Sequence, residues 1–135
     1  MMIEIAERVR ELLLEEFPYS PNLERQCKRS SILLDLVRKK EGLEGYIEAG
    51  HVIKRDRDYG HTWNIIVIEG EEYVLDASLT QFQEEMEEEV PSIVCGMKKD
   101  VYKQYGYLPD GRGKYEYHKD DVRKSLRQKA GVEQT

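Results

Sequence analysis

The strongest constraint in this sequence is a pair of short apolar segments separated by two residues that favour a tight turn. Residues 62–68 and 72–77 each have strand character, and Glu69 and Gly70 lie between them. A two-residue turn here makes Ile68 face Glu71 and Trp63 face Asp76 across a hairpin. Because a slip of one residue turns every side chain to the other face of a sheet, this turn decides which polar groups meet.

The predicted register brings two polar side chains together at one end of the hairpin. His61 lies two residues before Trp63 on the same strand face, so Asp76 is its diagonal neighbour. Their backbones are then roughly 7–8 Å apart, a separation that side chains bridge. A carboxylate beside an imidazole holds the ring in one tautomer. The hairpin therefore predicts a base and its orienting group, provided that the turn has two residues.

Two helices are expected before the hairpin. Residues 3–17 carry apolar side chains at helical spacing and predict an amphipathic helix that faces the core. Pro18 and Pro21 interrupt that pattern, and we expect the second helix to begin between Ser20 and Asn22. It should run through Cys27 to about residue 40.

The faces of the second helix follow from its spacing. Its apolar stripe is expected to contain Ser30, Leu33, Leu34 and Val37. The opposite side is expected to contain Lys28, Asp35 and Lys39.

The remaining segments complete an α+β pattern in one domain spanning residues 1–135, because the chain is long enough for one core and too short for two. We expect the domain's core at 20–82 and a C-terminal strand and helix within 112–130. The expected segments are a strand at 46–53, a charged loop at 54–58, an exposed segment or short helix end at 83–89, a short buried strand at 90–97, turns at 105–111, a strand at 114–118 and a helix at 120–130.

Cys27 is the candidate nucleophile. A thiol reacts as its thiolate, which a neighbouring base or a helix N-terminus favours, and Cys27 lies early in the expected helix at the edge of its apolar stripe. Arg25, Lys28 and Arg29 are close in sequence, but side chains one or two positions apart on a helix do not face each other. A cysteine in this position is also typical of a small buried hydrophobe, and that alternative stays open.

Composition argues against several classes of partner. The formal net charge is −6, so the molecule as a whole repels nucleic acid and anionic membranes. No apolar stretch approaches the roughly 18 residues of a membrane span, and the first residues are acidic where a signal peptide is basic. We therefore expect a cytoplasmic protein with no nucleic-acid and no membrane partner.

Metal and cofactor sites are not expected. His51 and His118 have no second metal ligand at a recognised spacing, and Leu108 occupies the position where a phosphate-binding loop before Lys114 would need glycine. Cys27 and Cys95 are expected to stay free thiols in a reducing compartment.

Three separated motifs resemble the core of the transglutaminase-like branch of the papain-like fold. These are a cysteine on a helix, an H-x-W strand and a G-x-W/Y-x-x-x-D strand, matched here by Cys27, by His61 and Trp63, and by residues 70–76 ending in Asp76. The residues after Asp76, up to Gln81 and Phe82, also resemble the D-x-T-x-x-Q-F ending of some bacterial amidase and deamidase domains. The resemblance covers residues 23–82.

This resemblance implies a papain-like fold and acyl transfer without a cofactor, on protein or peptide substrates. Cys27 would attack a carboxamide, His61 would pass a proton to the leaving amine, and Asp76 would orient the imidazole. The oxyanion would meet the Cys27 N–H and one side-chain donor. The candidates for the oxyanion hole and the substrate groove are Gln26, Asn22, Trp63 and Gln81.

Two other functions stay open. One is a catalytically inactive interaction domain on the same fold, in which residues 84–89 or the basic C-terminal helix contact a partner. The other is an acetyl transfer of the kind that arylamine acetyltransferases perform, for which this chain lacks the length of their additional domains. The oligomeric state and the substrate are not specified by the sequence.

Overall fold

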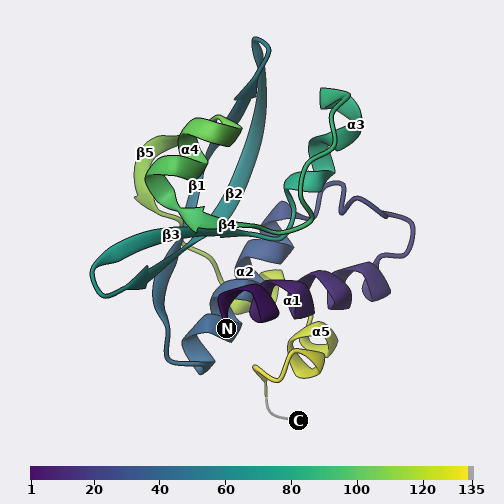
Figure 1. Ribbon diagram of the computed structural model, residues 1–135. Coiled ribbons are helices and arrows are strands. Elements are labelled where there is room, and N and C mark those ends of the chain that lie inside the picture. The colour runs from purple at the N-terminus through teal and green to yellow at the C-terminus, as the bar shows by residue number, and fades with distance from the viewer. Residues whose placement is uncertain (134–135) are drawn as a thin grey trace.

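The fold is α+β, with helices on both faces of one antiparallel sheet, as Figure 1 shows for this computed structural model. The structure describes residues 1–133, within which the sheet has five strands in the order β4-β3-β2-β1-β5. The strands are β1 (Glu44–Lys54), β2 (Arg57–Ile68), β3 (Glu71–Asp76), β4 (Val94–Met97) and β5 (Tyr107–Lys114). The helices are α1 (Met2–Glu16), α2 (Cys27–Lys40), α3 (Gln83–Met86), α4 (Lys98–Tyr105) and α5 (Lys124–Lys129), with 3-10 turns η1 (Leu79–Phe82) and η2 (Lys119–Asp121).

The predicted register of the central hairpin is confirmed. β2 pairs with β3 from Ile68 opposite Glu71 to Asn64 opposite Leu75. Glu69 and Gly70 both have positive φ, at 52° and 80°, as a two-residue turn between antiparallel strands requires. If this pairing is extended by one residue, Asp76, the last residue of β3, lies opposite Trp63 of β2.

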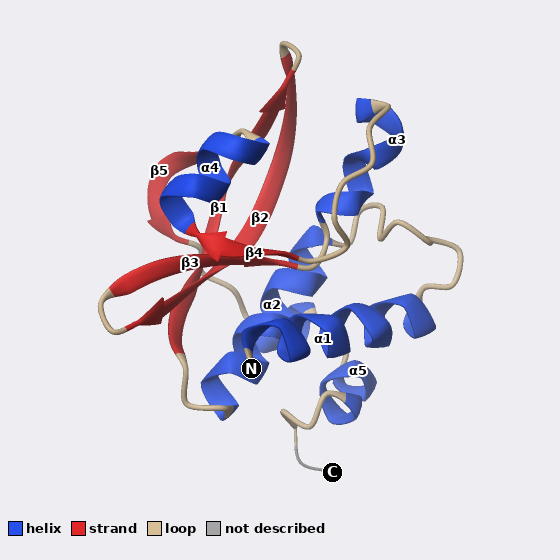
Figure 2. Cartoon of the chain, in the orientation of Figure 1, coloured by secondary structure: helices blue, strands red, loops and turns tan. Residues whose placement is uncertain are grey.

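The sheet separates two hydrophobic clusters. Figure 2 shows α1, α2 and α5 gathered on one side of the strands and α4 on the other. Ile47, Ile66 and Leu75 pack against the first group, whereas Trp63 and Val74 belong to the cluster that contains α4. Because side chains alternate along a strand, β2 and β3 contribute to both clusters.

Helix α2 is buried more completely than its expected stripe. Every residue from position 30 to position 35 is buried, because α1, the sheet and η2 all contact this helix. The expectation that Asp35 lies on the solvent side is wrong. Its carboxylate accepts from Tyr117 Oη at 2.6 Å and pairs with the Arg38 guanidinium at 2.7 and 2.8 Å, so the buried charge is matched.

The expected start of α2 is also wrong, and the difference bears on the site. The helix begins at Cys27, not between Ser20 and Asn22. Leu23 and Arg25 adopt left-handed φ values of 58° and 64°, which a right-handed helix does not allow. Cys27 is therefore the first residue of α2.

The C-terminal half differs most from the sequence-based expectation. Helix α4 was not anticipated, and the segment expected as turns at 105–111 forms most of β5. Of the last strand expected at 114–118, only Lys114 lies in the sheet, although Tyr115 N–H still donates to Ile47 O at 2.8 Å. β5 is an edge strand, where Pro109 is tolerated because a proline there leaves no ladder bond unmade.

The expected charged loop at 54–58 is wrong, because β1 extends to Lys54 and β2 begins at Arg57, so that only Arg55 and Asp56 form the turn. The remaining expected segments are close to the observed ones. The first helix, the strand at 46–53, the short helix within 83–89 and the short strand within 90–97 are confirmed, and the last helix begins at Lys124 after η2. Cys27 and Cys95 are free thiols. Across residues 1–133, no helix combines the length and the apolar character needed to cross a membrane.

Gly106 joins α4 to β5 and should not tolerate a side chain. Its φ is +77°, and a Cβ would lie 2.2 Å from Ile53 O, so Gly106→Ala combines left-handed strain with a backbone clash. We expect a loss of about 3 kcal/mol in the free energy of unfolding. Urea denaturation measures it, with Gly111→Ala as the matched control.

Gly111 has a similar φ of +80°, but a Cβ there meets nothing within 4 Å. Gly111→Ala should therefore cost roughly 1–2 kcal/mol, from strain alone. Equal losses in the two variants would contradict the close approach at Gly106.

Candidate active site

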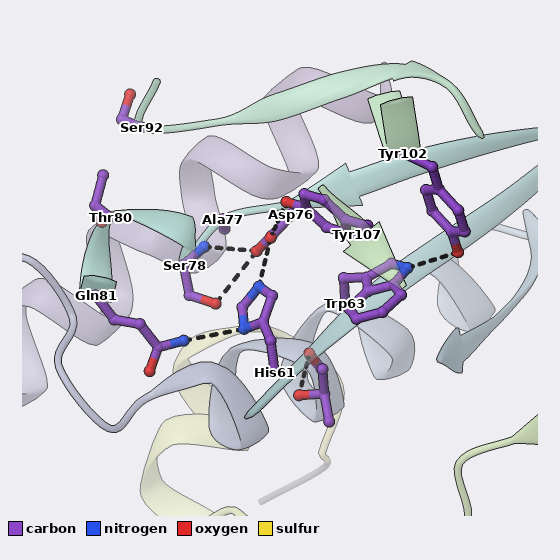
Figure 3. Close-up of polar contacts among 12 residues, drawn as sticks. His61, Trp63, Asp76, Ala77, Ser78, Thr80, Gln81, Ser92, Tyr102 and Tyr107 are labelled. Atoms are coloured by element: carbon purple, nitrogen blue, oxygen red, sulfur yellow. Dashed lines mark hydrogen bonds and ion pairs between the residues drawn. The ribbon is translucent and has the colours of Figure 1, made fainter. Parts of the chain in front are cut away.

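Asp76 is the last residue of β3, and its carboxylate is surrounded by donors. Oδ1 accepts from Ser78 N–H at 2.9 Å and from Ser78 Oγ at 3.2 Å. Oδ2 lies 2.6 Å from His61 Nε2 and accepts from Tyr107 Oη at 2.5 Å. Figure 3 shows these groups converging on Asp76. Burial raises the pKa of Asp76, but His61, Tyr107 and Ser78 outweigh it, so the net pKa is lowered and the carboxylate stays ionised.

His61 lies on β2 with both ring nitrogens directed at polar groups. Nε2 faces Asp76, and Gln81 Nε2 lies 3.1 Å from Nδ1 (Figure 3). In the neutral ring, the Nε2 proton is donated to the carboxylate and Nδ1 accepts from the Gln81 amide, whereas in the imidazolium Nδ1–H is itself a donor. The ring is enclosed by Trp63, Phe82 and Tyr107, with ring centroids 5.9, 5.2 and 6.0 Å away. This packing fixes the orientation of the imidazole.

The Cys27 thiol is the third member of this group. It is half-buried at the first turn of α2, where backbone N–H groups point outward and the helix dipole favours a negative charge. Burial raises its pKa, but hydrogen bonds with His61, Gln81 and the Thr62 N–H, together with the His61 charge, lower it to about 7. The lowered pKa reflects a thiol that lies within reach of the His61 imidazole and the Gln81 amide.

The charges of Cys27 and His61 depend on each other. Burial lowers the pKa of His61, but the Asp76 carboxylate and the Cys27 sulfur raise it to about 9. Between pH 7 and 9 the favoured pair is thus a thiolate and an imidazolium. This is the protonation state in which a cysteine is nucleophilic and its partner can supply a proton.

Two hydrogen bonds fix α2 against the strand that carries His61. Ser31 Oγ and Thr62 Oγ1 are 3.0 Å apart, and Asn64 Nδ2 donates to Ser31 O at 2.9 Å. Both contacts join the first turns of α2 to residues within three positions of His61. They set the position of Cys27 relative to the imidazole.

Arg10 of α1 stabilises the turn that follows Asp76. Arg10 Nη1 donates to Ala77 O at 2.9 Å and to Thr80 Oγ1 at 3.0 Å, and it lies 3.5 Å from Ser92 O. Thr80 Oγ1 in turn donates to Asn22 O at 3.0 Å. The segment between Asp76 and Gln81 is therefore tied to the first helix and to the loop before Cys27.

The three residues of the predicted triad lie together. The four residues predicted for the oxyanion hole or the substrate groove lie in different surroundings. Gln81 lies beside His61 and Cys27. Gln26 immediately precedes Cys27 and accepts from Arg29 at 3.2 Å. Trp63 is fully buried and donates its indole N–H to Tyr102 Oη at 2.9 Å, so it is not an oxyanion donor.

Asn22 contributes its backbone carbonyl to Thr80. Two residues of the site, Tyr107 and Arg10, were not predicted from the sequence. Tyr107 falls in the segment expected as turns, and Arg10 lies on the first helix among other charged residues, so neither carried a distinguishing signal.

No group of three or more His, Cys, Asp or Glu side chains within residues 1–133 is arranged to hold a metal ion. Comparison with models of protein families, with curated proteins and with solved structures found no match.

The two cysteines should react with iodoacetamide in different pH ranges. The pKa of Cys27 is lowered to about 7, whereas burial raises that of Cys95 above its ordinary value, so the Cys27 thiolate forms at lower pH. We expect the labelling rate of Cys27 to be half-maximal near pH 7, as followed by mass spectrometry of the two alkylated peptides of the wild-type protein. His61→Gln should move that midpoint to higher pH, because it removes the imidazolium. Matching profiles for the two cysteines would contradict the site.

The Arg10 contact should contribute to both stability and reactivity. Arg10→Ala leaves Ala77 O and Thr80 without their charged donor, and we expect a loss of about 1.5–3 kcal/mol in the free energy of unfolding. Cys27 labelling should slow, because Gln81 and Asp76 flank the released turn. Arg8→Ala is the control, since Arg8 lies on the same helix as Arg10 but makes only an exposed contact, with Lys129 O of α5. An Arg10→Ala protein as stable as Arg8→Ala would contradict the bracing role.

Proposed function

We propose that this protein is a cysteine-dependent enzyme that hydrolyses or transfers acyl groups from amides, with the fold and mechanism of the transglutaminase-like branch of the papain-like fold. One observation carries the proposal. His61 lowers the pKa of a half-buried thiol at a helix N-terminus, Cys27, and lies 2.6 Å from the buried Asp76 carboxylate. This order is the one needed by a nucleophile, a base and the group that orients the base.

The first half of the reaction follows from the protonation state of the pair. The Cys27 thiolate attacks the carbonyl carbon of an amide, and a C–S bond forms as the carbonyl electrons move to oxygen. The His61 imidazolium then donates its Nδ1 proton to the amide nitrogen, and the C–N bond breaks. The products are a free amine and a thioester on Cys27. Asp76 keeps its charge and holds Nε2–H throughout.

The developing oxyanion has two kinds of donor within the site. Cys27 occupies the first position of α2, so its N–H has no acceptor one helical turn earlier. Gln81 is the better placed of the side-chain amides, because it already contacts both His61 and Cys27. Gln26 is adjacent but is engaged with Arg29. The Cys27 N–H and the Gln81 amide together are the proposed oxyanion hole.

The second half of the reaction resolves the thioester. Neutral His61 takes a proton from water, and the resulting hydroxide attacks the thioester carbon, which gives a carboxylic acid and restores the thiol. An amine in place of water gives a new amide. Both outcomes use the same residues. The proposed substrates are glutamine side chains or peptide bonds of proteins and peptides, because the resemblance of the three motifs supports that class.

Three substitutions test the proposal with a glutamine-containing peptide library, ammonia release and peptide cleavage being measured together. Cys27→Ala should abolish turnover, and Asp76→Asn should lower kcat by roughly 10³–10⁴-fold, because the wrong tautomer is favoured. Activity should be bell-shaped in pH with limbs near 7 and 9, since it needs the thiolate and the imidazolium. Cys95→Ala is the control and should keep full activity.

A covalent intermediate gives a second readout. Rapid acid quenching followed by mass spectrometry should detect an acyl adduct on Cys27 in the wild type and none in Cys27→Ala. If Cys27 labels rapidly but forms no adduct with any peptide amide, the inactive interaction domain becomes the better description.

A further inference from the structure

Tyr107 reaches the proposed site from the far edge of the sheet. It is the first residue of β5, it is 4% exposed, and its hydroxyl donates to Asp76 Oδ2 at 2.5 Å. His61 Nε2 contacts the same oxygen at 2.6 Å. One carboxylate oxygen is thus shared between the proposed base and a tyrosine from a strand that lies three places from β3 in the sheet.

The ring of Tyr107 is held independently of its hydroxyl. It packs edge-on against Trp63 with ring centroids 4.9 Å apart and stacks on Tyr102 at 5.8 Å with an interplanar angle of 12°. Gly106 sets the direction of the chain as it enters β5. The hydroxyl is therefore delivered to the carboxylate by a rigid ring, and phenylalanine would fill the same space.

The two carboxylate oxygens of Asp76 accept hydrogen bonds from different residues. Ser78 contributes both its N–H and its hydroxyl to Oδ1, which keeps the side chain in place even without Tyr107. The Tyr107 hydroxyl instead acts on Oδ2, the oxygen that stabilises the imidazolium. A donor on that oxygen draws away part of its negative charge and weakens its hold on the His61 proton.

We propose that Tyr107 is a positioning residue that limits the basicity of His61 by sharing Asp76 Oδ2 with it. Its catalytic meaning rests on the proposed function, because a moderated base releases its proton to the leaving amine more readily. The sharing of Oδ2 itself is a property of the folded site and can be measured without turnover.

The groups that act on His61 come from four elements. Cys27 lies on α2, Asp76 on β3 and Tyr107 on β5, and the Arg10 guanidinium on α1 acts through its attraction to Asp76. The pKa of Tyr107 lies well above its ordinary value, from burial first and then from Asp76, so its hydroxyl stays a donor over the whole working range. Only His61 and Cys27 change charge near neutral pH among these groups.

The test compares Tyr107→Phe with Tyr107 in a Cys27→Ala background, in which the proposed reaction cannot occur. The His61 imidazole is titrated by NMR, and its signals are assigned by their loss in His61→Gln. We expect the His61 pKa to rise by about 0.5–1 unit in Tyr107→Phe, because Oδ2 regains charge. A second measurement in the intact site is the pH midpoint of Cys27 labelling, which should fall.

Tyr102→Phe is the matched control. Tyr102 stacks on Tyr107, but its hydroxyl donates to Glu48 and accepts from Trp63, so the His61 pKa should not move. Thermal unfolding of each variant shows whether the fold is kept. A folded Tyr107→Phe protein with an unchanged or lowered His61 pKa would overturn the inference.

The two proposals fail separately. If His61 shifts as expected but no amide substrate is turned over, the sharing of Oδ2 stands and the proposed function falls. If turnover and the acyl adduct are found but His61 does not shift, the inference about Tyr107 alone falls.

Discussion

The hydrogen bond between His61 and Asp76 is the interaction on which the rest of this site depends. It joins two side chains that are 0% and 1% exposed, across a hairpin whose register leaves no freedom in which face they share. A buried carboxylate is costly unless it is both paired and fully hydrogen-bonded, and Asp76 meets this requirement with donors on both oxygens. The same pairing determines which nitrogen of His61 faces Cys27.

Helices and strands that are distant in sequence stabilise the contact between His61 and Asp76. The first helix supplies Arg10 beneath the turn after Asp76, and the Ser31 contacts anchor the second helix on the strand of His61. The last strand supplies Tyr107. Residues from both sheet faces thus meet at one end of the central hairpin, where the helix that carries Cys27 begins. The site is a product of the whole domain and not of the hairpin alone.

The parts of the site that could be predicted are those with local causes. The turn at Glu69 and Gly70 and the alternation of side chains are set by neighbouring residues, so the pairing of His61 with Asp76 could be derived from the sequence. The start of α2 could not, because Leu23 and Arg25 adopt left-handed conformations that non-glycine residues seldom signal. Tyr107 was missed because the glycines around it favour turns, whereas pairing with β1 makes the segment a strand.

Cys27, His61 and Asp76 differ in burial, and this difference determines which of them solvent can reach. Asp76 and His61 are enclosed by aromatic rings and by the sheet, while Cys27, at the start of α2, is only half-buried. A small reagent from solvent therefore reaches Cys27 more readily than the buried imidazole. Reagents that modify histidine should accordingly be excluded from a site whose thiol is open to alkylation.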